Sequence, residues 1–247
     1  MTRRPPTSTC SRRNPCGMAA CDDCHLIWRN DFRKRLRQLL RGHDNVAYST
    51  IILTDPALRQ KKLKRIHPKA VVQQFRMMLR RLGLGHLTLV GLLEVDWNEL
   101  AGCWEPHFHL LVLDPDANFT SLKKHLKTQD PHRGDRDKQV YRPVVTEFLV
   151  IEDDKSAVIG YITKMRPMRK WPYHAKGKRR YRKARLRGKQ KRAAEAWLSR
   201  PPRDFAFLQN VRLEASGFRL LRPLSGKSSK STVRSINRPK GGVYKRI

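Results

Sequence analysis

Two histidines, His107 and His109, stand one residue apart at the start of an apolar run that ends at Leu113. On a β-strand, alternate side chains point to the same face, so this spacing turns both imidazoles one way and Phe108 the other. Two imidazoles on one face can bind a single metal ion. The alternative is a strand with two half-exposed histidines, but the apolar run indicates a buried strand, where unpaired imidazoles are costly.

The strand that precedes the histidines supplies carboxylates for the same face. If the hairpin turn is centred on residues 101–102, Glu94 lies opposite His109 and Asp96 lies opposite His107. Directly opposed residues in an antiparallel pair are about 4.5–5.5 Å apart. Two nitrogen ligands and up to two oxygen ligands, with open positions, suit Mg²⁺ or Mn²⁺, although imidazole also accepts Zn²⁺.

A candidate nucleophile follows in the segment 158–165, which reads VIGYITKM. On a helix Tyr161 and Lys164 are three residues apart and are therefore neighbours. A tyrosine phenol has a pKa near 10, and a nearby ammonium favours its deprotonated form. Attack on a phosphodiester would give a covalent phosphotyrosine, which retains the energy of the cleaved bond. The alternative is that Tyr-x-x-Lys belongs to an ordinary basic helix.

The elements that must position these residues follow the hydrophobic periodicity. Helices are expected at 28–41, 68–82, 119–127 and 155–165, strands at 46–54, 87–97, 107–113 and 144–151, and a hairpin loop at 98–106. A short apolar segment at 205–221 is expected to return a strand to the sheet. The order β-α-β-β-α-β-α predicts an α+β fold with an antiparallel sheet and helices packed on it. We expect a Cys-rich basic segment at 1–42, a catalytic domain at 43–222 with a basic insertion at 166–200, and a basic flexible tail at 223–247.

The charge of the chain indicates a polyanionic partner. Lysine and arginine number 54 against 21 acidic residues, a formal net charge of +33. Nucleic acid is the expected partner, because a charge of this size needs a polyanion to neutralise it. A membrane is the rival, but no segment has the 18 or so apolar residues that a spanning helix needs. The basic N-terminus lacks the apolar core of a secretory signal, so we expect a cytoplasmic protein.

The segment 165–200 contains 15 lysines and arginines and one acid, Glu195, with aromatic rings between them. Such a mixture binds phosphates through its cations and stacks unpaired bases on its rings. The alternative is a solvated basic helix. The predicted DNA-binding residues are Arg166, Arg169, Lys170, Trp171, Tyr173, Lys178, Arg179 and Arg180.

Four of the five cysteines fall within the first 24 residues, as Cys10, Cys16, Cys21 and Cys24. In a cytosolic protein such a cluster favours metal over disulfides. A structural four-cysteine zinc site is one interpretation, with His25 as an alternative ligand, and reduced cysteines without a ligand are the other. No catalytic role is indicated for them.

Three segments together resemble the motifs of the HUH endonucleases, and most closely those of rolling-circle initiators of small bacterial plasmids. They are the strand 49–55, the strand Glu105-Pro106-His107-Phe108-His109, and the helical Tyr161-Ile162-Thr163-Lys164. The resemblance covers roughly residues 46–165. It implies a ferredoxin- or RRM-like antiparallel sheet with the two histidines on a central strand, Mg²⁺ or Mn²⁺ as cofactor, and Glu94 as third ligand. It also implies that Tyr161 nicks single-stranded DNA at a replication origin.

In that family the 5′ end is kept as a phosphotyrosine and the free 3′-hydroxyl primes synthesis, with a host helicase and polymerase as expected partners. Lys164 would position the phosphate or the phenol. Glu105 stands where many plasmid initiators carry a further histidine, and the third motif holds one tyrosine, Tyr161, where several phage initiators carry two. The alternatives are a single-tyrosine HUH transposase and a non-enzymatic DNA- or RNA-binding protein. A distance of more than about 10 Å between Tyr161 and the histidines would favour the non-enzymatic protein.

Overall fold

The computed structural model describes residues 10, 15–41, 43, 45–59, 62–114, 116–135, 138–140, 142–149, 152–175, 178–214 and 217–221. Its helices are α1 (Asp22–Leu40), α2 (Pro68–Arg81), α3 (Thr120–Gln129), α4 (Glu152–Ile162) and α5 (Gly188–Leu198), with 3-10 turns η2 (Leu63–Arg65) and η3 (Pro202–Phe205). Its strands are β1 (Val46–Ile52), β2 (Leu89–Asn98), β3 (Cys103–Val112), β4 (Val144–Leu149), β5 (Met168–Ala175), β6 (Lys178–Arg185), β7 (Ala206–Gln209), β8 (Val211–Glu214) and β9 (Gly217–Leu220).

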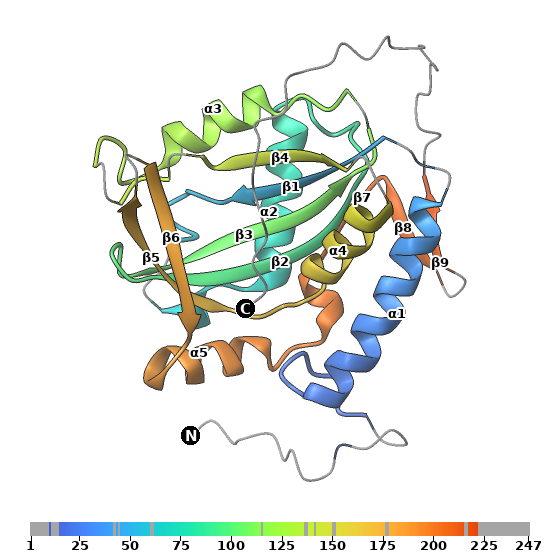
Figure 1. Ribbon diagram of the computed structural model, residues 1–247, viewed down its shortest axis with the longest axis horizontal. Coiled ribbons are helices and arrows are strands. Elements are labelled where there is room, and N and C mark those ends of the chain that lie inside the picture. Colours follow the sequence, from blue (N-terminus) through green and yellow to red (C-terminus); the bar gives the residue numbers. More distant parts are fainter. Residues whose placement is uncertain are drawn as a thin grey trace.

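One sheet organises the molecule (Figure 1). Its strand order is β4-β1-β3-β2-β5-β6, with β7 also paired to β2. Neighbours are antiparallel except β2 and β5, which run parallel over Trp97 and Asn98 only. The expected α+β class, the helix on either side of the β2–β3 hairpin and the order from β1 to α4 are confirmed. The returning strand is confirmed as β7, which pairs with residues 89–92 of β2.

The β2–β3 hairpin differs from the expected one in its turn. Strand β3 begins at Cys103 rather than after a loop to residue 106. The Asn98 side chain accepts hydrogen bonds from the backbone N–H groups of Leu100 (3.1 Å) and Ala101 (3.0 Å), and Gly102 takes a left-handed φ of 59°. Glycine adopts that conformation without steric cost, so the chain turns one residue earlier than predicted.

The earlier turn corrects the predicted register. Glu94 lies opposite His107, and Asp96 lies opposite Glu105. Each pairing is shifted by two residues from the expected one, and because side chains alternate with a period of two, the shift keeps Glu94 on the face of the histidines. The face was predicted correctly and the individual pairs were not.

Strand β3 presents two chemically different faces. On one, Phe108 stacks on Phe75 of α2 with ring centroids 4.4 Å apart, and Phe207 of β7 lies 5.0 Å from Phe75. On the other, His107 and His109 face α4. In Figure 1, helix α2 lies behind the sheet and α4 in front of it. The apolar face anchors the strand, and the polar face is left for the site.

The N-terminal and C-terminal parts extend this core. Helix α1 begins at Asp22, six residues before the expected start, and packs on α4 and β9. The segment 166–200 is not a single basic helix, because it forms the β5–β6 hairpin followed by α5. The expected tail at 223–247 lies outside the described residues. Among the described residues, no helix is long and apolar enough to cross a membrane.

The aromatic stack between α2 and β3 gives a stability prediction. Phe75→Ala should lower the free energy of unfolding by about 3–5 kcal/mol, since the removed ring is fully buried and leaves a cavity. Met77→Ala on the same helix is the matched control, because that side chain is 36% exposed; its effect should stay within about 0.5 kcal/mol. Urea denaturation followed by circular dichroism measures both, and equal losses would contradict the assigned core.

Candidate metal centre and tyrosine

The structure brings Glu94, His107 and His109 together. The Glu94 Oε2 atom lies 3.9 Å from His107 Nε2 and 3.6 Å from His109 Nε2. One ligand atom from each residue falls within 4.8 Å of the other two, and all three side chains are buried. The three residues predicted as metal ligands therefore form one cluster across β2 and β3.

Both imidazoles are held so that Nε2 faces the cluster. His109 Nδ1 lies 2.5 Å from the Tyr48 hydroxyl and 3.2 Å from Thr50 Oγ1, both on β1. His107 Nδ1 lies 3.1 Å from the backbone carbonyl oxygen of Glu105. A metal-binding histidine ordinarily has its second ring nitrogen fixed in this way, which orients the ring and sets the tautomer.

The polar atoms at the centre of the cluster fit a cation. Glu94 Oε1 and His109 Nε2 are buried and have no hydrogen-bond partner among the described residues. Burial lowers the pKa of His107 to about 4. At neutral pH this imidazole is therefore uncharged, and one ring nitrogen has a free lone pair that can bind a metal. Burial alone would raise the pKa of Glu94, but the adjacent imidazoles of His109 and His107 outweigh that effect and lower it. Two imidazole nitrogens and a carboxylate suit Mg²⁺ or Mn²⁺, and would also accept Zn²⁺.

Asp96, which could have supplied a fourth ligand, is engaged elsewhere. It accepts a hydrogen bond of 2.9 Å from the backbone N–H of Met168, and its Oδ2 lies 3.7 Å from Lys183 Nζ and 4.0 Å from Lys170 Nζ. It is not one of the residues that cluster with Glu94. These contacts attach the β5–β6 hairpin, which was not predicted from the sequence, to the sheet through the Asp96 carboxylate.

Glu105 belongs to a buried ion network and not to the metal cluster. Its Oε1 is 2.7 Å from Arg59 Nη2 and 2.8 Å from Asn98 Nδ2, and its Oε2 is 2.7 Å from Lys170 Nζ. Arg59 also pairs with Asp130 at 2.9 Å. Burial opposes ionisation of Glu105, but Lys170 and Arg59 outweigh it and lower the pKa of the carboxyl group. Buried charges need such pairing.

Lys170 was predicted to contact DNA, and its burial corrects that prediction. The side chain is 7% exposed, and its ammonium group is directed at Glu105 and Asp96 beneath the hairpin. Burial would lower the pKa of Lys170, but the two carboxylates raise it instead. The lysine therefore fastens β5 to the sheet.

Tyr161 lies beside the metal cluster. Its ring centroid is 4.9 Å from that of His109 and 6.1 Å from that of Tyr48, in edge-to-face contacts. The side chain is 42% exposed, so its ring contacts the site and still reaches solvent. Partial burial raises the pKa of Tyr161, and a hydrogen bond and charge from Lys183 oppose that rise.

The cation beside the phenol is therefore Lys183 of β6, not Lys164. Lys164 follows the end of α4, where its backbone N–H donates to the Tyr161 carbonyl oxygen at 3.1 Å, and its side chain is exposed. A helical spacing of three predicted the wrong lysine because α4 ends at Ile162. Lys183 gave no signal in the sequence, being one of many cations in a segment not expected to pair as strands.

Helix α1 fixes the end of α4 that carries the tyrosine. Arg33 Nε donates to Thr163 Oγ1 at 2.8 Å, and Arg33 Nη2 donates to the Gly160 carbonyl oxygen at 3.0 Å. Arg29 Nη2 approaches the same carbonyl at 3.5 Å. Carbonyls at a helix C-terminus lack partners within the helix, so these arginines satisfy groups next to Tyr161.

The four N-terminal cysteines also come together. The Sγ atom of Cys24 lies 3.4 Å from that of Cys10 and 3.6 Å from that of Cys16, and Cys21 Sγ lies 3.4 Å from Cys10 Sγ. Zn–S bonds of about 2.3 Å in a tetrahedron separate the sulfurs by about 3.8 Å. The Gly17 N–H donates to Cys24 Sγ at 3.3 Å. The geometry fits a tetrahedral thiolate site, and His25 is not part of the group.

The predicted DNA-binding residues divide between the two faces of the β5–β6 hairpin. Strand alternation sends Lys170 and Lys183 toward the sheet, as described above. On the other face the Arg169 guanidinium lies 5.0 Å from the Trp171 ring, and the Arg182 guanidinium lies 6.0 Å from the Tyr173 ring. Arg166 and Arg180 are exposed, and the side chains of Lys178 and Arg179 lie outside the described residues.

Comparison of the chain with protein-family models, curated proteins and solved structures gives no match.

The cluster geometry gives a metal-binding prediction. Mn²⁺ should bind the protein and raise its melting temperature, because a ligand that binds only the folded state at 100 times its Kd adds about 2.7 kcal/mol of stability. Glu94→Gln should abolish this shift, since it removes the anionic ligand. Isothermal titration calorimetry and thermal melts measure both.

Glu99→Gln is the matched control, because Glu99 is an acid of the same hairpin with a 45% exposed side chain. It should bind Mn²⁺ as the unsubstituted protein does. Undiminished Mn²⁺ binding by the Glu94→Gln variant would rule out this cluster as the site.

Proposed function

We propose that this chain is a metal-dependent nickase of single-stranded DNA, of the HUH endonuclease type, which initiates rolling-circle replication of a plasmid in the cytoplasm. The observation that carries the proposal is the position of Tyr161. Its ring centroid lies 4.9 Å from that of His109, a member of the three-residue cluster. This is well inside the distance of about 10 Å beyond which a non-enzymatic protein would be favoured.

The topology of the sheet supports the proposal. The β1-α2-β2-β3-α3-β4 segment, with strand order β4-β1-β3-β2, has the connectivity of a ferredoxin-like sheet. The two histidines lie on β3, between β1 and β2. The first motif of the resemblance also supports the proposal, because its Thr50, together with Tyr48 just before the motif, supplies a hydroxyl that orients His109.

Glu94, His107 and His109 would hold the cation. A bound Mg²⁺ or Mn²⁺ would polarise a phosphoryl oxygen and make the phosphorus more electrophilic. The Tyr161 phenolate would attack that phosphorus while the bond to the 3′ oxygen breaks. The phenol proton would be lost to water before the attack, and the departing 3′ oxygen would take up a proton from water. The 5′ phosphate remains on the tyrosine and a 3′-hydroxyl is left to prime a host polymerase.

Lys183 would stabilise the phenolate and hold its oxygen in place. Its ammonium group is anchored by Asp96 at 3.7 Å and interacts with the phenol of Tyr161. A positive charge beside a phenol favours the ionised form of this nucleophile. The β5–β6 hairpin thus contributes to the chemistry through its inner face.

The outer face of the hairpin suits single-stranded DNA. Tyr173 is 40% exposed, and Trp171 is half-buried beside Arg169. Bases stack on such rings and phosphates pair with the adjacent guanidinium groups. Binding of this kind has little sequence preference, so it would complement recognition of the origin and not replace it.

The cysteine cluster would hold a structural Zn²⁺. Gly17 N–H donates to Cys24 Sγ, and despite the opposing effect of burial this bond and the neighbouring thiols lower the pKa of Cys24 to about 7. A thiolate at neutral pH is the form that binds zinc. The cluster sits at the start of α1, so its role would be to order that helix.

The nucleophile is tested with single-stranded DNA from the replicon of the protein, labelled at the 5′ or the 3′ end, in Mn²⁺ or EDTA. The unsubstituted protein should form a covalent adduct that needs the metal and retains the label 3′ of the nick. Tyr161→Phe should form none, because the phenol oxygen is the attacking atom, while Tyr181→Phe should keep forming it. Denaturing gels measure the adduct.

The same assay separates the alternatives. If the protein and both variants bind origin-spanning DNA but form no adduct, the nickase proposal is wrong and a non-enzymatic binding protein is favoured. Adduct formation on transposon ends, but not on the origin, would identify the single-tyrosine transposase.

The lysine assignment makes a separate prediction. Lys183→Ala should slow adduct formation about 10- to 100-fold, because the phenol loses its charge partner and its positioning contact. Lys164→Ala should change the rate less than about 2-fold, since its side chain is exposed. Single-turnover rates as a function of pH measure both, and a larger loss in Lys164→Ala would return the role to the motif lysine.

A further inference from the structure

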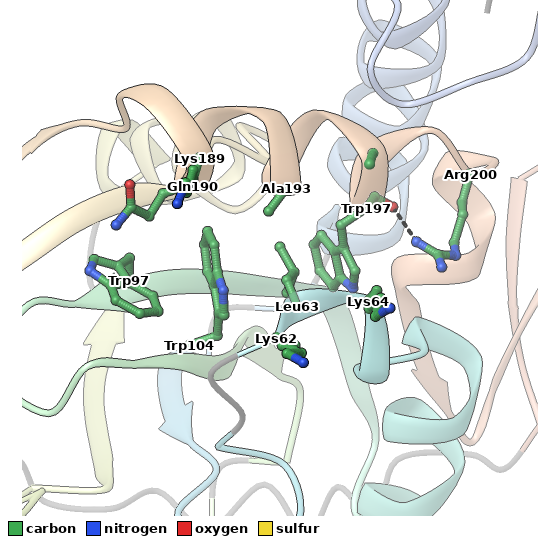
Figure 2. A pocket seen from close by; sticks show the side chains of 11 residues that line it. Lys62, Leu63, Lys64, Trp97, Trp104, Lys189, Gln190, Ala193, Trp197 and Arg200 are labelled. Carbon is green, nitrogen blue, oxygen red and sulfur yellow. Dashed lines mark hydrogen bonds between the residues drawn. The ribbon is translucent and has the colours of Figure 1, made fainter. Parts of the chain in front are cut away.

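A groove with aromatic walls lies between α5, η2 and the end of the β2–β3 hairpin (Figure 2). Its volume is about 470 Å³, within the usual range for small-ligand sites. The lining residues that matter here are Trp97, Trp104 and Trp197 with the cations Lys62, Lys64 and Lys189. None of them belongs to the metal cluster or to the β5–β6 hairpin.

Strand alternation places this groove on the sheet face opposite the metal cluster. Trp97 is three residues from Glu94, and Trp104 is three residues from His107. Both tryptophans therefore point to the sheet face opposite the one that carries Glu94 and His107. The two tryptophans are directly paired across the hairpin, with ring centroids 5.4 Å apart. Their position ties the groove to the same pair of strands that holds Glu94 and His107.

The Trp197 ring is held in place by two contacts. Trp197 Nε1 donates to the Ile66 carbonyl oxygen at 2.7 Å, and its ring packs edge-on against Phe205. In Figure 2, Leu63 lies between Trp104 and Trp197. Trp97 is half-buried, and its Nε1–H has no acceptor among the described residues. One wall of the groove thus keeps a partly exposed aromatic ring, that of Trp97.

The rim of the groove is cationic. Lys62, Lys64 and Lys189 are exposed, and none of them forms an ion pair within the described part of the chain. Arg200 completes the rim, and no acidic residue lines the groove. The partly exposed Trp97 ring beneath these cations matches a nucleobase attached to phosphates, since the ring can stack on the base and the cations neutralise the backbone.

We propose that this groove binds one unstacked base of the single-stranded DNA that continues from the active site around the end of the β2–β3 hairpin. The inference rests on the proposed function. Three residues of strand separate Trp97 from Glu94, about 10 Å along β2. A second hollow of about 390 Å³ lies at the end of the β2–β3 hairpin, lined by Arg169, Trp171 and the hairpin residues Glu99 and Leu100. A strand that passes around this end of the hairpin would meet the cations and rings of both hollows.

The groove is tested by binding of fluorescein-labelled (dT)20 to the full chain in a Tyr161→Phe background, at several salt concentrations. Lys189→Gln should weaken binding and reduce the slope of log K against log salt by about 0.7, the value for one phosphate contact on a single strand. Trp97→Ala should weaken binding about 5- to 100-fold, the range for loss of one base stack. Fluorescence anisotropy measures both.

Two further variants keep the test decisive if Trp97→Ala is unstable in a thermal melt. Arg192→Gln is the matched charge control, because Arg192 is exposed on α5 and does not line the groove. It should leave the salt slope unchanged. Ala193→Leu fills the groove without removing a packed ring, since Figure 2 shows Ala193 pointing into it, and it should weaken binding as Trp97→Ala does.

The outcomes distinguish this inference from the proposed function. Adduct formation by Tyr161 together with equal (dT)20 affinities in all groove variants would overturn the base-binding groove and leave the nickase standing. Weakened binding in Lys189→Gln and Ala193→Leu, but not in Arg192→Gln, supports the groove even if no adduct forms. If a protein segment occupies the groove instead, all groove variants should bind (dT)20 with equal affinity.

Discussion

Strand β3 is buried on both faces, and everything else in the structure follows from how its two faces are covered. Phe108 is fully buried against Phe75 of α2, and this packing holds the strand in the core. The opposite face must then bury Glu105, His107 and His109, which are polar. Burial of polar groups is tolerated only when each finds a partner, so the surrounding elements are arranged to supply partners.

Three buried carboxylates line that polar side, and they are neutralised in different ways. Glu105 pairs with Arg59 and Lys170, and Asp96 receives a backbone N–H and lies near Lys183. Glu94 meets only imidazoles among the described residues, and one of its oxygens has no partner. The distribution of lysines and arginines thus leaves one carboxylate for a cation. The same lysines attach the β5–β6 hairpin next to Tyr161, so its docking and the electrostatics of the site depend on the same ion pairs.

The sequence predicted those features that a local period or spacing determines. His-x-His on a buried strand fixed the shared face, and the apolar pattern located the helices around the β2–β3 hairpin. The register could not be predicted because it depends on the Asn98 side chain and on Gly102 in the turn. The β5–β6 strands gave no alternating apolar signal, since they dock through Lys170 and Lys183 instead of through a hydrophobic face. Which lysine meets Tyr161 depends on that docking, so sequence spacing selected Lys164.

Helix α1 joins two parts of the molecule that are far apart in the sequence. Its first turn carries Cys24, and its middle carries Arg29 and Arg33, which bind the carbonyl and hydroxyl groups at the end of α4. A helix transmits order along its axis, because each turn is bonded to the next. Any ligand that orders the thiols therefore adds its binding free energy to the docked state of α1, and through the two arginines to the placement of the Tyr161 backbone. The N-terminal cysteines and the tyrosine are in this sense one thermodynamic unit, although 137 positions separate Cys24 from Tyr161 (161 − 24).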